Sequence, residues 1–534
     1  MFEKVLIANR GEIALRVARA CRELGVRSVA VYSTADAESA VVRFADESVH
    51  IGPPATGRSY LHIPSLIGAA LKTGADALHP GYGFLSEDPY FAEICADEGI
   101  TFIGPRPDVM EKVGDKATAR QLMQEAGLPL LPGTVEPVNT IDEAHDIASD
   151  IGYPVIIKAV AGGGGRGMSV VMQEEDLPRL YQTTRATAQA VFKDSAVYIE
   201  RYLETSRHTE IQLVCDAHGD GVYFGERDCS VQRRHQKLIE EAPSIHLTEE
   251  TRREVGEAAV RGALSVGYTG AGTMEFLLDL DGNLYFMEMN ARIQVEHPVS
   301  ELVTDTDLIQ EQIRVAAGEK LSRTQDDVLP LKGHAIECRI NAEDPDNNFA
   351  PAAGKLDTYV PPGGPWTRVD SHCYPGWMIS PFYDSLIAKL IVWAPDREGA
   401  IDRMQRALGE FEIGGRGVKT TIPFHQRLMA NEQSYEAWAY EIHHSAKKDA
   451  PSGTLWKLIE EMKRAGYTRK IDSGSNRAGA HPGTHEIGFD SAADTITLRH
   501  VARSREGFAL GALRAAKWII GKKGVYEFSD IVFE

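Results

Sequence analysis

The chain has 534 residues, of which 43% are hydrophobic and 25% charged, as in ordinary soluble globular proteins. A chain of this length is expected to fold into several domains with sizeable cores. Its formal net charge of −20 argues against nonspecific nucleic-acid binding, and because it has no apolar run of about 18 residues, no membrane span is expected.

The N-terminus and the cysteines indicate the cellular compartment. The first residues enter a strand pattern directly, without the shape of a signal peptide. The six cysteines are scattered and form no CxxC pair, which suits reduced thiols better than disulfides or a zinc site. Both features predict a cytoplasmic protein.

The first segment of the chain predicts a parallel α/β layer. The apolar run Val5–Ala8 is followed by a turn, a helical pattern and a second strand at Ser28–Tyr32. This order is typical of a parallel sheet, which strands at Ala75–Leu78 and Thr101–Gly104 would extend. The first turn reads Asn9-Arg-Gly-Glu12 and is not a GxGxxG fingerprint, so no NAD(P)H site is expected.

A glycine-rich loop follows the predicted buried strand Val155–Lys158. Residues 161–168 read AGGGGRGM, and glycines let backbone N–H groups approach phosphate oxygens closely. The loop is not a P-loop, and a flexible surface loop is the alternative. Lys158 and Lys116 carry charges that neutralise the phosphates of a nucleotide, which favours the lid of an ATP-grasp domain.

Two further stretches carry charged and amide side chains in dense order. Residues 226–241 read ERDCSVQRRHQKLIEE; such a run is usually a solvated face, but this one also holds a Gln and a His. Residues 288–297 read EMNARIQVEH. A strand that ends in a carboxylate, an amide and an arginine does not suit a core, but it can hold a metal–phosphate complex beside an anionic substrate. Glu275 and Glu288, at the ends of adjacent strands, are expected ligands for Mg²⁺, with surface acids as the alternative.

These stretches resemble the biotin carboxylase family nearly continuously over residues 1 to about 430. Matching blocks in the same order include IANRGEIALRVARA, HPGYGFLSE, GYPVIIKA, GGGGRGM, HTEIQ, GAGTMEFL, GHAIECRINAEDP and PFYDSLIAKLIVW. The resemblance implies a multidomain α/β and α+β fold. Its parts would be a pre-ATP-grasp domain over residues 1–113, an ATP-grasp domain over 114–330 with a lid at about 131–203, and a C-terminal biotin carboxylase domain over 331–434.

The resemblance also implies roles for individual residues. ATP would be held by Lys116, Lys158, Gly163, Gly164, Gly165, Gly167, Glu200, Leu203, His208, Gln232 and His235. Mg²⁺ or Mn²⁺ would be held by Glu275, Glu288 and Asn290. Bicarbonate and biotin would be bound by Lys237, Arg292, Gln294, Val295, Arg339 and Tyr82. Catalysis would fall to Glu296, as the general base for bicarbonate, with Arg292, Lys237 and Arg339. An ordinary strand salt bridge is the alternative for Arg339.

We therefore expect a biotin carboxylase that uses ATP and bicarbonate, in the first half-reaction of an acetyl-CoA carboxylase or a related acyl-CoA carboxylase. The sequence has no Met-Lys-Met biotinylation site and no carboxyltransferase region. Biotin is thus expected on a separate biotin carboxyl carrier protein, with carboxyltransferase subunits as further partners and a homodimer or higher homo-oligomer as the assembly. Another ATP-grasp ligase and an inactive scaffold are the alternatives, against which the RIQVEH and QRRHQK blocks argue.

Three positions depart from the family pattern. Ala291 stands in Asn-Ala-Arg where Thr is commoner, and Ala353 stands where Pro is usual. Arg201 replaces a usual Lys at a position near the adenine base. None of the three removes a proposed catalytic group.

The last segment, residues 435–534, differs in charge and in pattern. It carries 15 basic and 13 acidic side chains, whereas residues 1–434 carry 42 and 64. Residues 441–454 read EIHHSAKKDAPSGT, in which histidines and a lysine indicate proton transfer near an anion, with a polar turn before a helix as the alternative. Together with RAGAHPGTHE at 477–486, this stretch resembles the C-terminal domain of 4-hydroxy-tetrahydrodipicolinate reductases.

The reductase resemblance implies a substrate site made of His443 as general acid, its neighbour His444, its partner Lys447, and the carboxylate ligands Gly453 and Thr454. Because a dinucleotide fingerprint is missing, such a site would have no hydride source in this chain. Three interpretations stay open: an oligomerisation module, an incomplete dihydrodipicolinate reductase that works with another chain, and a fused or chimeric chain whose join near residues 433–435 has no linker.

Overall fold

The computed structural model describes residues 1–134, 136–160, 167–430, 436–464, 467, 470–490, 495–504, 506–520 and 522. The predicted nucleotide ligands Gly163, Gly164 and Gly165 lie outside the described residues. The chain divides into two compact units, Met1–Met429 and Ala430–Glu534, here called the body and the tail. Among the described residues, none of the helices combines the length and the apolar character that crossing a membrane requires.

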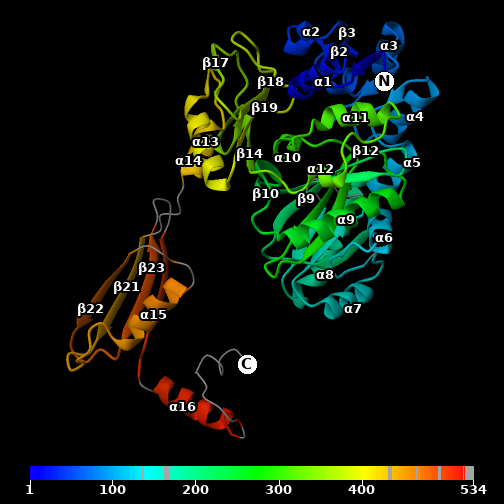
Figure 1. Cartoon of the computed structure of the whole chain (residues 1–534). Helices are drawn as coiled ribbons and strands as arrows, with labels where there is room; N and C mark the ends of the chain where they lie inside the picture. Colours follow the sequence, from blue (N-terminus) through cyan, green and yellow to red (C-terminus); the bar gives the residue numbers. More distant parts are fainter. Residues whose placement is uncertain are drawn as a thin grey trace. The chain divides into compact units, whose positions relative to one another are not determined.

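The body begins with a five-stranded sheet in the order β3-β2-β1-β4-β5, in which all neighbours are parallel. Figure 1 labels β2 and β3 of this sheet. Leu6 of the central strand and Val17 of the first helix are fully buried, so the layer is held by apolar burial between helix and sheet. The predicted parallel α/β layer is therefore confirmed. Its elements are β1 Lys4–Ile7, α1 Gly11–Glu23, β2 Arg27–Ser33, α2 Ala40–Phe44, β3 Glu47–Gly52, α3 Ile63–Thr73, β4 Ala77–His79, α4 Pro89–Asp97 and β5 Thr101–Phe102.

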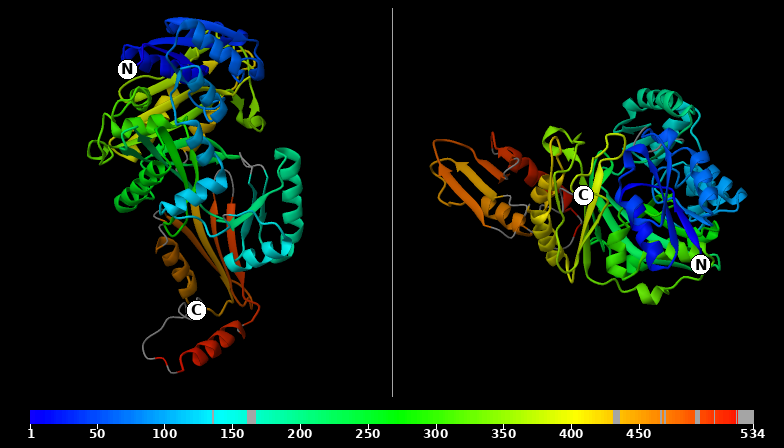
Figure 2. Two further views of the ribbon diagram at one scale, coloured as in Figure 1. Left: turned by 90° about the vertical axis from the view of Figure 1, so that its right-hand side faces the viewer. Right: turned by 90° about the horizontal axis from the view of Figure 1, so that it is seen from above.

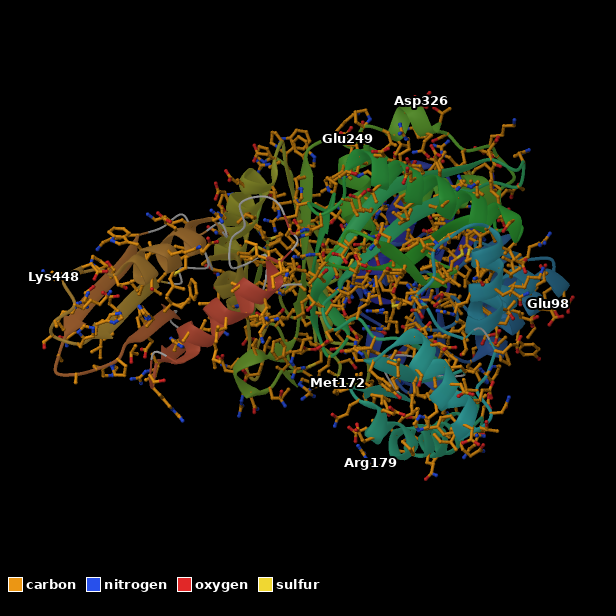
Figure 3. All side chains as sticks on the ribbon, turned by 90° about the horizontal axis from the view of Figure 1, so that it is seen from below. Glu98, Met172, Arg179, Glu249, Asp326 and Lys448 are labelled. Carbon is orange, nitrogen blue, oxygen red and sulfur yellow. The ribbon has the colours of Figure 1, made fainter. Side chains whose placement is uncertain are left out.

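The lid is a smaller layer of the body, with two helices packed on a three-stranded antiparallel sheet in the order β7-β6-β8. Its core includes Ile157 and Ile199 from the strands and Leu177 and Tyr181 from a helix. The lid stands out as a lobe of its own in both views of Figure 2. Met172 and Arg179 mark it in Figure 3. Its elements are β6 Val155–Ala159, β7 Met168–Val171, β8 Val197–Arg201, α7 Ile141–Ile151 and α8 Leu177–Phe192.

The centre of the body is an eight-stranded sheet in the order β13-β12-β9-β10-β11-β14-β19-β18. Strands from residues 331–434 join this sheet because β14 pairs antiparallel with β11, with Cys338 opposite Ile239. The charged run 226–241 forms the β10–β11 hairpin inside the same sheet. The strands are β9 Arg207–Cys215, β10 Gly221–Arg233, β11 Gln236–Ala242, β12 Gly270–Leu278, β13 Leu284–Asn290, β14 His334–Asn341, β18 Thr367–Ser371 and β19 Leu386–Ala394.

Helices and two short ribbons complete the body. The helices are α5 Pro107–Gly114, α6 Lys116–Glu125, α9 Glu249–Ser265, α10 His297–Thr304, α11 Leu308–Ala316, α12 Gln325–Val328, α13 Arg397–Glu410 and α14 Ile422–Ala430. The ribbons pair β15 Glu343–Asp344 with β16 Ala350–Pro351, and β17 Thr358–Val360 with β20 Glu412–Gly414. All six cysteines of the chain are free thiols.

The tail contains a four-stranded mixed sheet in the order β22-β21-β23-β24. The parallel pair is β21 with β22, whereas β23 runs antiparallel to both β21 and β24. Leu455 and Ile459 of α15 pack on Ala439 and Ile487 of the sheet. The elements are β21 Glu436–His443, α15 Gly453–Arg464, β22 Ile471–Arg477, β23 Thr484–Asp490, β24 Thr495–Val501 and α16 Glu506–Trp518.

Candidate active site

A cleft of about 1180 Å³ lies in the body, lined by residues of the first layer, the lid and the central sheet. Nearly all of the described body residues that the sequence singled out line it, although they come from separate elements. They are Tyr82, Lys116, Lys158, Glu200, Leu203, His208, Gln232, His235, Lys237, Glu275, Glu288, Asn290, Arg292, Gln294, Val295, Glu296 and Arg339. Gly167 does not line the cleft and is buried. A Cβ atom added to it would lie only 3.0 Å from the Cβ of Ala159.

The centre of the cleft is the carboxylate of Glu296, held between two cations. Glu296 is the residue before α10, and its side chain is buried. Lys237 Nζ donates to its Oε1 at 2.7 Å, and Arg339 Nη2 donates to its Oε2 at 2.8 Å. Burial alone would raise the pKa of Glu296, but Lys237, Arg339 and Arg227 outweigh burial and hold it well below its ordinary value. Glu296 is therefore ionised while both cations hold it.

Lys237 and Arg339 are themselves anchored by further buried carboxylates, which sequence reasoning missed. Lys237 Nζ donates to Glu210 Oε2 at 2.5 Å, and Arg339 Nε donates to Glu240 Oε1 at 2.6 Å. Glu240 was inside the charged run, but nothing in that run showed that its carboxylate faces Arg339 of β14. The two cations are thus positioned before any substrate binds.

Glu240 also faces a second carboxylate, because it pairs in register with Glu337 across β11 and β14. Both side chains are fully buried, and among the described residues neither oxygen of Glu337 has a hydrogen-bond partner. Burial raises the pKa of each above its ordinary value; Glu240 raises the pKa of Glu337 further, and Glu296 does the same to Glu240. Protonation is therefore more favourable at Glu240 and Glu337, whose pKa values are raised, than at Glu296, whose pKa is lowered.

A fully buried arginine, Arg227 of β10, ties the strands under the cleft together. Its guanidinium donates to Glu210 Oε1 at 2.6 Å, to Gln212 Oε1 at 2.9 Å and to Gln294 Oε1 at 3.0 Å. It also donates to Ser300 Oγ at 3.0 Å, which connects α10 to the sheet. Arg227 therefore positions Glu210 and Gln294 from below.

The predicted bicarbonate residues lie on the segment between β13 and α10. Arg292 Nε donates to Glu87 Oε2 at 2.8 Å, and Gln294 Nε2 donates to Glu275 Oε1 at 2.8 Å. The backbone oxygen of Val295 accepts a hydrogen bond from Lys389 Nζ at 2.8 Å. Glu87 was not singled out from the sequence, although it is the last residue of the HPGYGFLSE block.

The predicted metal ligands occupy two paired strands. Glu275 of β12 lies in register with Glu288 of β13, which places both side chains on one face of the sheet. Asn290 Nδ2 donates to Glu275 Oε1 at 2.9 Å, and Glu288 Oε2 lies 3.2 Å from Lys116 Nζ. Burial favours protonation of Glu275, yet Lys237 and other donors outweigh it and lower its pKa. Two carboxylates and an amide oxygen form a donor set that fits Mg²⁺.

The part of the cleft predicted to hold the nucleotide combines the lid with α6. Lys158 Nζ of β6 donates to Glu200 Oε2 of β8 at 2.5 Å, and Arg120 donates to the other oxygen of Glu200. Glu200 is almost fully buried, so its carboxylate positions these two cations. Arg120 lines the cleft and was missed, since nothing in the sequence around it resembles a motif.

His235 reaches the cleft from a strained turn. Arg234 and His235 form the two-residue loop between β10 and β11, with φ values of 50° and 65°. Such a turn normally uses Asn-Gly, and a larger side chain at positive φ costs about 1–3 kcal/mol. The strain is consistent with a functional position. Nearby, Gln232 Nε2 donates to Cys229 O at 2.7 Å, and His208 Nε2 lies 3.1 Å from Glu275 Oε2.

Tyr82, from the HPGYGFLSE block, also lines the cleft. The hydroxyl of Tyr82 donates a hydrogen bond to the carboxylate of Glu12. Glu12 also forms an ion pair with Lys389, whose Nζ lies 3.1 Å from Glu12 Oε1. Lys389 is fully buried and also contacts Val295 as described above. Tyr82 is therefore oriented by a buried ion pair.

The tail places its predicted residues at the end of β21 and the start of α15. His443 ends β21, and Gly453 and Thr454 open α15. Lys447 Nζ pairs with Asp449 Oδ1 at 2.9 Å, and Lys448 marks this loop at one end of the tail in Figure 3. Burial lowers the pKa of His443 below its ordinary value. His444 follows the strand without joining the side-chain contacts of His443.

Four family models match successive parts of the chain. Residues 1–110 match the N-terminal domain of biotin carboxylase, and residues 337–442 match its C-terminal domain. Residues 115–324 match the ATP-binding domain of the carbamoyl-phosphate synthase L chain. Residues 417–532 match the C-terminus of dihydrodipicolinate reductase, which confirms the second resemblance.

Similar proteins cover the body almost completely. A biotin carboxylase of Nostoc sp. is 57% identical over 432 residues, which are 81% of this chain and 96% of that protein. Biotin carboxylase 1 of Bacillus subtilis is 53% identical over 433 residues, which are 81% of this chain and 96% of that protein.

Solved structures agree with these relatives. A biotin carboxylase–βγ-ATP complex from Campylobacter jejuni is similar with a TM-score of 0.77 and 48% identity, over 81% of this chain and 96% of that one. A second is the biotin carboxylase domain dimer of Hydrogenobacter thermophilus 2-oxoglutarate carboxylase, in complex with MgADP, ADP and bicarbonate. Its TM-score is 0.76 at 49% identity, over 81% of this chain and 95% of that one. The chain therefore belongs to the biotin carboxylase family and is an ATP-dependent ligase of the ATP-grasp class.

Proposed function

We propose that the body carboxylates biotin carried by a separate protein, through carboxyphosphate. The observation that supports this most directly is the clamp of Glu296 between Lys237 and Arg339, in one cleft with the lid cations and the segment Arg292–Glu296. In the first step an oxygen of bicarbonate attacks the γ-phosphate of ATP and ADP leaves. The products are carboxyphosphate and ADP, with the proton of bicarbonate accepted by the protein.

Glu296 would accept this proton, and the site indicates when it can. As long as both cations hold the carboxylate, its depressed pKa makes it a weak base. An incoming bicarbonate anion would compete for Lys237 and Arg339, whose other partners, Glu210 and Glu240, stay in place. Loss of cationic contacts raises the pKa of Glu296 at the moment when the proton must be taken.

Phosphoryl transfer would be served by α6, the lid and the paired strands β12 and β13. Lys116 and Lys158 would neutralise charge on the transferred and leaving phosphates. Glu275, Glu288 and Asn290 would hold a divalent metal, which supplies charge neutralisation and orientation of the phosphates. Lys116 Nζ lies 3.2 Å from Glu288 Oε2, so it would compete with the metal for that oxygen.

Carboxylation of biotin would follow at the Arg339 end. Carboxyphosphate breaks down to CO₂ and phosphate, and the phosphate takes the proton from N1 of biotin. Arg339 would stabilise the biotin enolate that results, with Tyr82 beside it. The final acceptor would be acetyl-CoA or a related acyl-CoA, on carboxyltransferase subunits that receive carboxybiotin from the carrier protein.

ATP hydrolysis tests this function directly. The purified full-length chain should hydrolyse ATP in a bicarbonate-dependent way, and free biotin should stimulate the rate. Hydrolysis that responds to bicarbonate but not to biotin would identify a different acceptor. A folded protein with no response to either would contradict the proposal.

We further propose that the tail is an assembly module for copies of this chain. The tail exposes an unusual number of large apolar side chains for its size, namely Trp456, Ile496, Leu498, Val501, Leu510, Leu513, Ile519 and Ile520. An oligomer larger than a dimer in light scattering, reduced by Leu498→Lys, would support this role. The same size for both proteins would contradict it.

A further inference from the structure

Three side chains of the tail bring their ligating atoms together beside α15. His443 of β21 and His485 of β23 have their Nε2 atoms 3.2 Å apart. Glu441 of β21 places its Oε2 3.5 Å from His443 Nε2 and 3.5 Å from His485 Nε2. The register of the sheet explains this convergence, because Glu441 pairs with His485 across β21 and β23 while His443 follows two residues later on the same face.

The three separations fit a tetrahedral metal centre. Zinc binds histidine nitrogen and carboxylate oxygen at about 2.0–2.2 Å, so tetrahedral ligand atoms lie roughly 3.3–3.5 Å apart. A hydrogen bond between the two imidazoles explains the distance of 3.2 Å between them, but it does not require a carboxylate oxygen equidistant from both. Two histidines and one carboxylate are also the ligand set of open zinc sites that keep a fourth position for water.

The surroundings hold the three groups in place. Glu441 is fully buried, and its other oxygen, Oε1, accepts from Ser452 N at 2.8 Å, from Ser475 Oγ at 3.0 Å and from Arg477 Nη2 at 2.8 Å. Ser452 Oγ also donates to Oε2 and is the one competitor for that oxygen among the described residues. Second-shell bonds of this kind orient a ligating carboxylate.

His443 is held from behind by backbone. A Cβ added to Gly483 would lie 2.9 Å from His443 Cε1, so this glycine allows the imidazole to sit against the chain. The side chains of His443 and His485 are each 11% exposed, which leaves a narrow opening to solvent. The nearby cation Lys447 is paired with Asp449 and not with the cluster.

We propose that the tail binds one divalent cation of the zinc class through His443 Nε2, His485 Nε2 and Glu441 Oε2. Nε2 of His443 cannot carry a proton while it ligates a metal, so this site excludes the general-acid role that the reductase resemblance implies for His443. The inference concerns the tail alone and does not rest on the function proposed for the body.

Zinc titration of the full-length chain tests the site. Isothermal titration calorimetry with Zn²⁺ as the titrant should show one tight site. The buffer contains excess Mg²⁺, which occupies the carboxylates of the body. His485→Ala and His443→Ala should each weaken it at least about 100-fold, more than a second-shell change would. The matched control His444→Ala, next to a ligand but outside the cluster, should keep the wild-type affinity.

Cobalt spectroscopy distinguishes loss of the metal site from loss of the fold in the variants. Wild-type protein loaded with Co²⁺ in excess Mg²⁺ should show the intense visible bands of tetrahedral coordination, and His485→Ala with an unchanged circular dichroism spectrum should lose them. Octahedral bands in the wild type would overturn the proposal. Equal zinc affinity in wild type and His485→Ala would overturn it too, because binding would then belong to thiols or carboxylates elsewhere.

Discussion

Replacing Glu296 by Gln removes one charge from the cleft and keeps the shape of the side chain. The carboxylate accepts two charge-assisted hydrogen bonds, from Lys237 at 2.7 Å and Arg339 at 2.8 Å. Each such bond contributes about 1.5–3 kcal/mol, but Lys237 keeps Glu210 and Arg339 keeps Glu240 as partners. We therefore expect a stability loss of only about 1–3 kcal/mol, which leaves the protein folded.

The loss of activity should be larger than the loss of stability. A general base contributes about 10²–10⁴-fold to the rate, which is roughly 3–5 kcal/mol of barrier. In a bicarbonate-dependent ATP hydrolysis assay with biotin, kcat should fall at least about 100-fold, with little change in the KM for ATP.

A matched substitution shows whether the effect belongs to Glu296 alone. Glu337→Gln removes another buried carboxylate, which lies outside the cleft lining and whose oxygens accept no hydrogen bond from the described residues. This control should keep most of the activity. The reasoning fails if Glu296→Gln keeps more than a tenth of wild-type kcat, or if both variants lose activity equally.

Three further predictions concern buried ion pairs of the body. Arg227→Met leaves Glu210 without its 2.6 Å partner and should cost about 3–5 kcal/mol, seen as a lower calorimetric Tm; an unchanged Tm would contradict the assigned role. Glu301 is buried, and although burial raises its pKa, two arginines lower it to about 2 from 4.5. It should stabilise the fold by about 3 kcal/mol above pH 4.5 and lose this contribution as pH falls toward 2, so Glu301→Gln should flatten the acid limb of stability; parallel limbs would argue against it. Glu200→Gln should raise the KM for ATP about tenfold or more, because it frees Lys158 of the lid and Arg120 of α6, which Glu200 positions, and an unchanged KM would refute this.

Local patterns were enough to place several strands and to single out Lys116, Lys158, Glu275 and Glu288, while the family resemblance named most of the other residues of the cleft. The apolar run before the glycine loop predicted the strand that is observed as Val155–Ala159, and the run Asn283–Met287 before Glu288 predicted a buried strand, which is observed as Leu284–Asn290. Both depend on apolar periodicity and turn residues, which act over a few positions. The residues 288–297 were recognisable as a site because core strands do not end in such a set of polar groups.

Partners that are distant in the chain could not be inferred in this way. Arg120 meets Glu200 across 80 positions, and Glu87 meets Arg292 across 205. In the sequence, Arg120 and Glu87 each look like an ordinary charged surface residue, so no local pattern distinguishes them.

By itself, the sequence determined the chemical groups of the cleft and the strands that carry them. It also showed that the last segment resembles a different family from the body. Only the tertiary structure decided which charges meet: Glu240 faces Glu337 through strand register, and Glu441 faces His485 in the same way. The physical reason is that register and layer packing are set by burial of apolar side chains over the whole sheet. The pKa values of these groups and the metal affinity of the tail then depend on distances between residues that lie far apart in the chain.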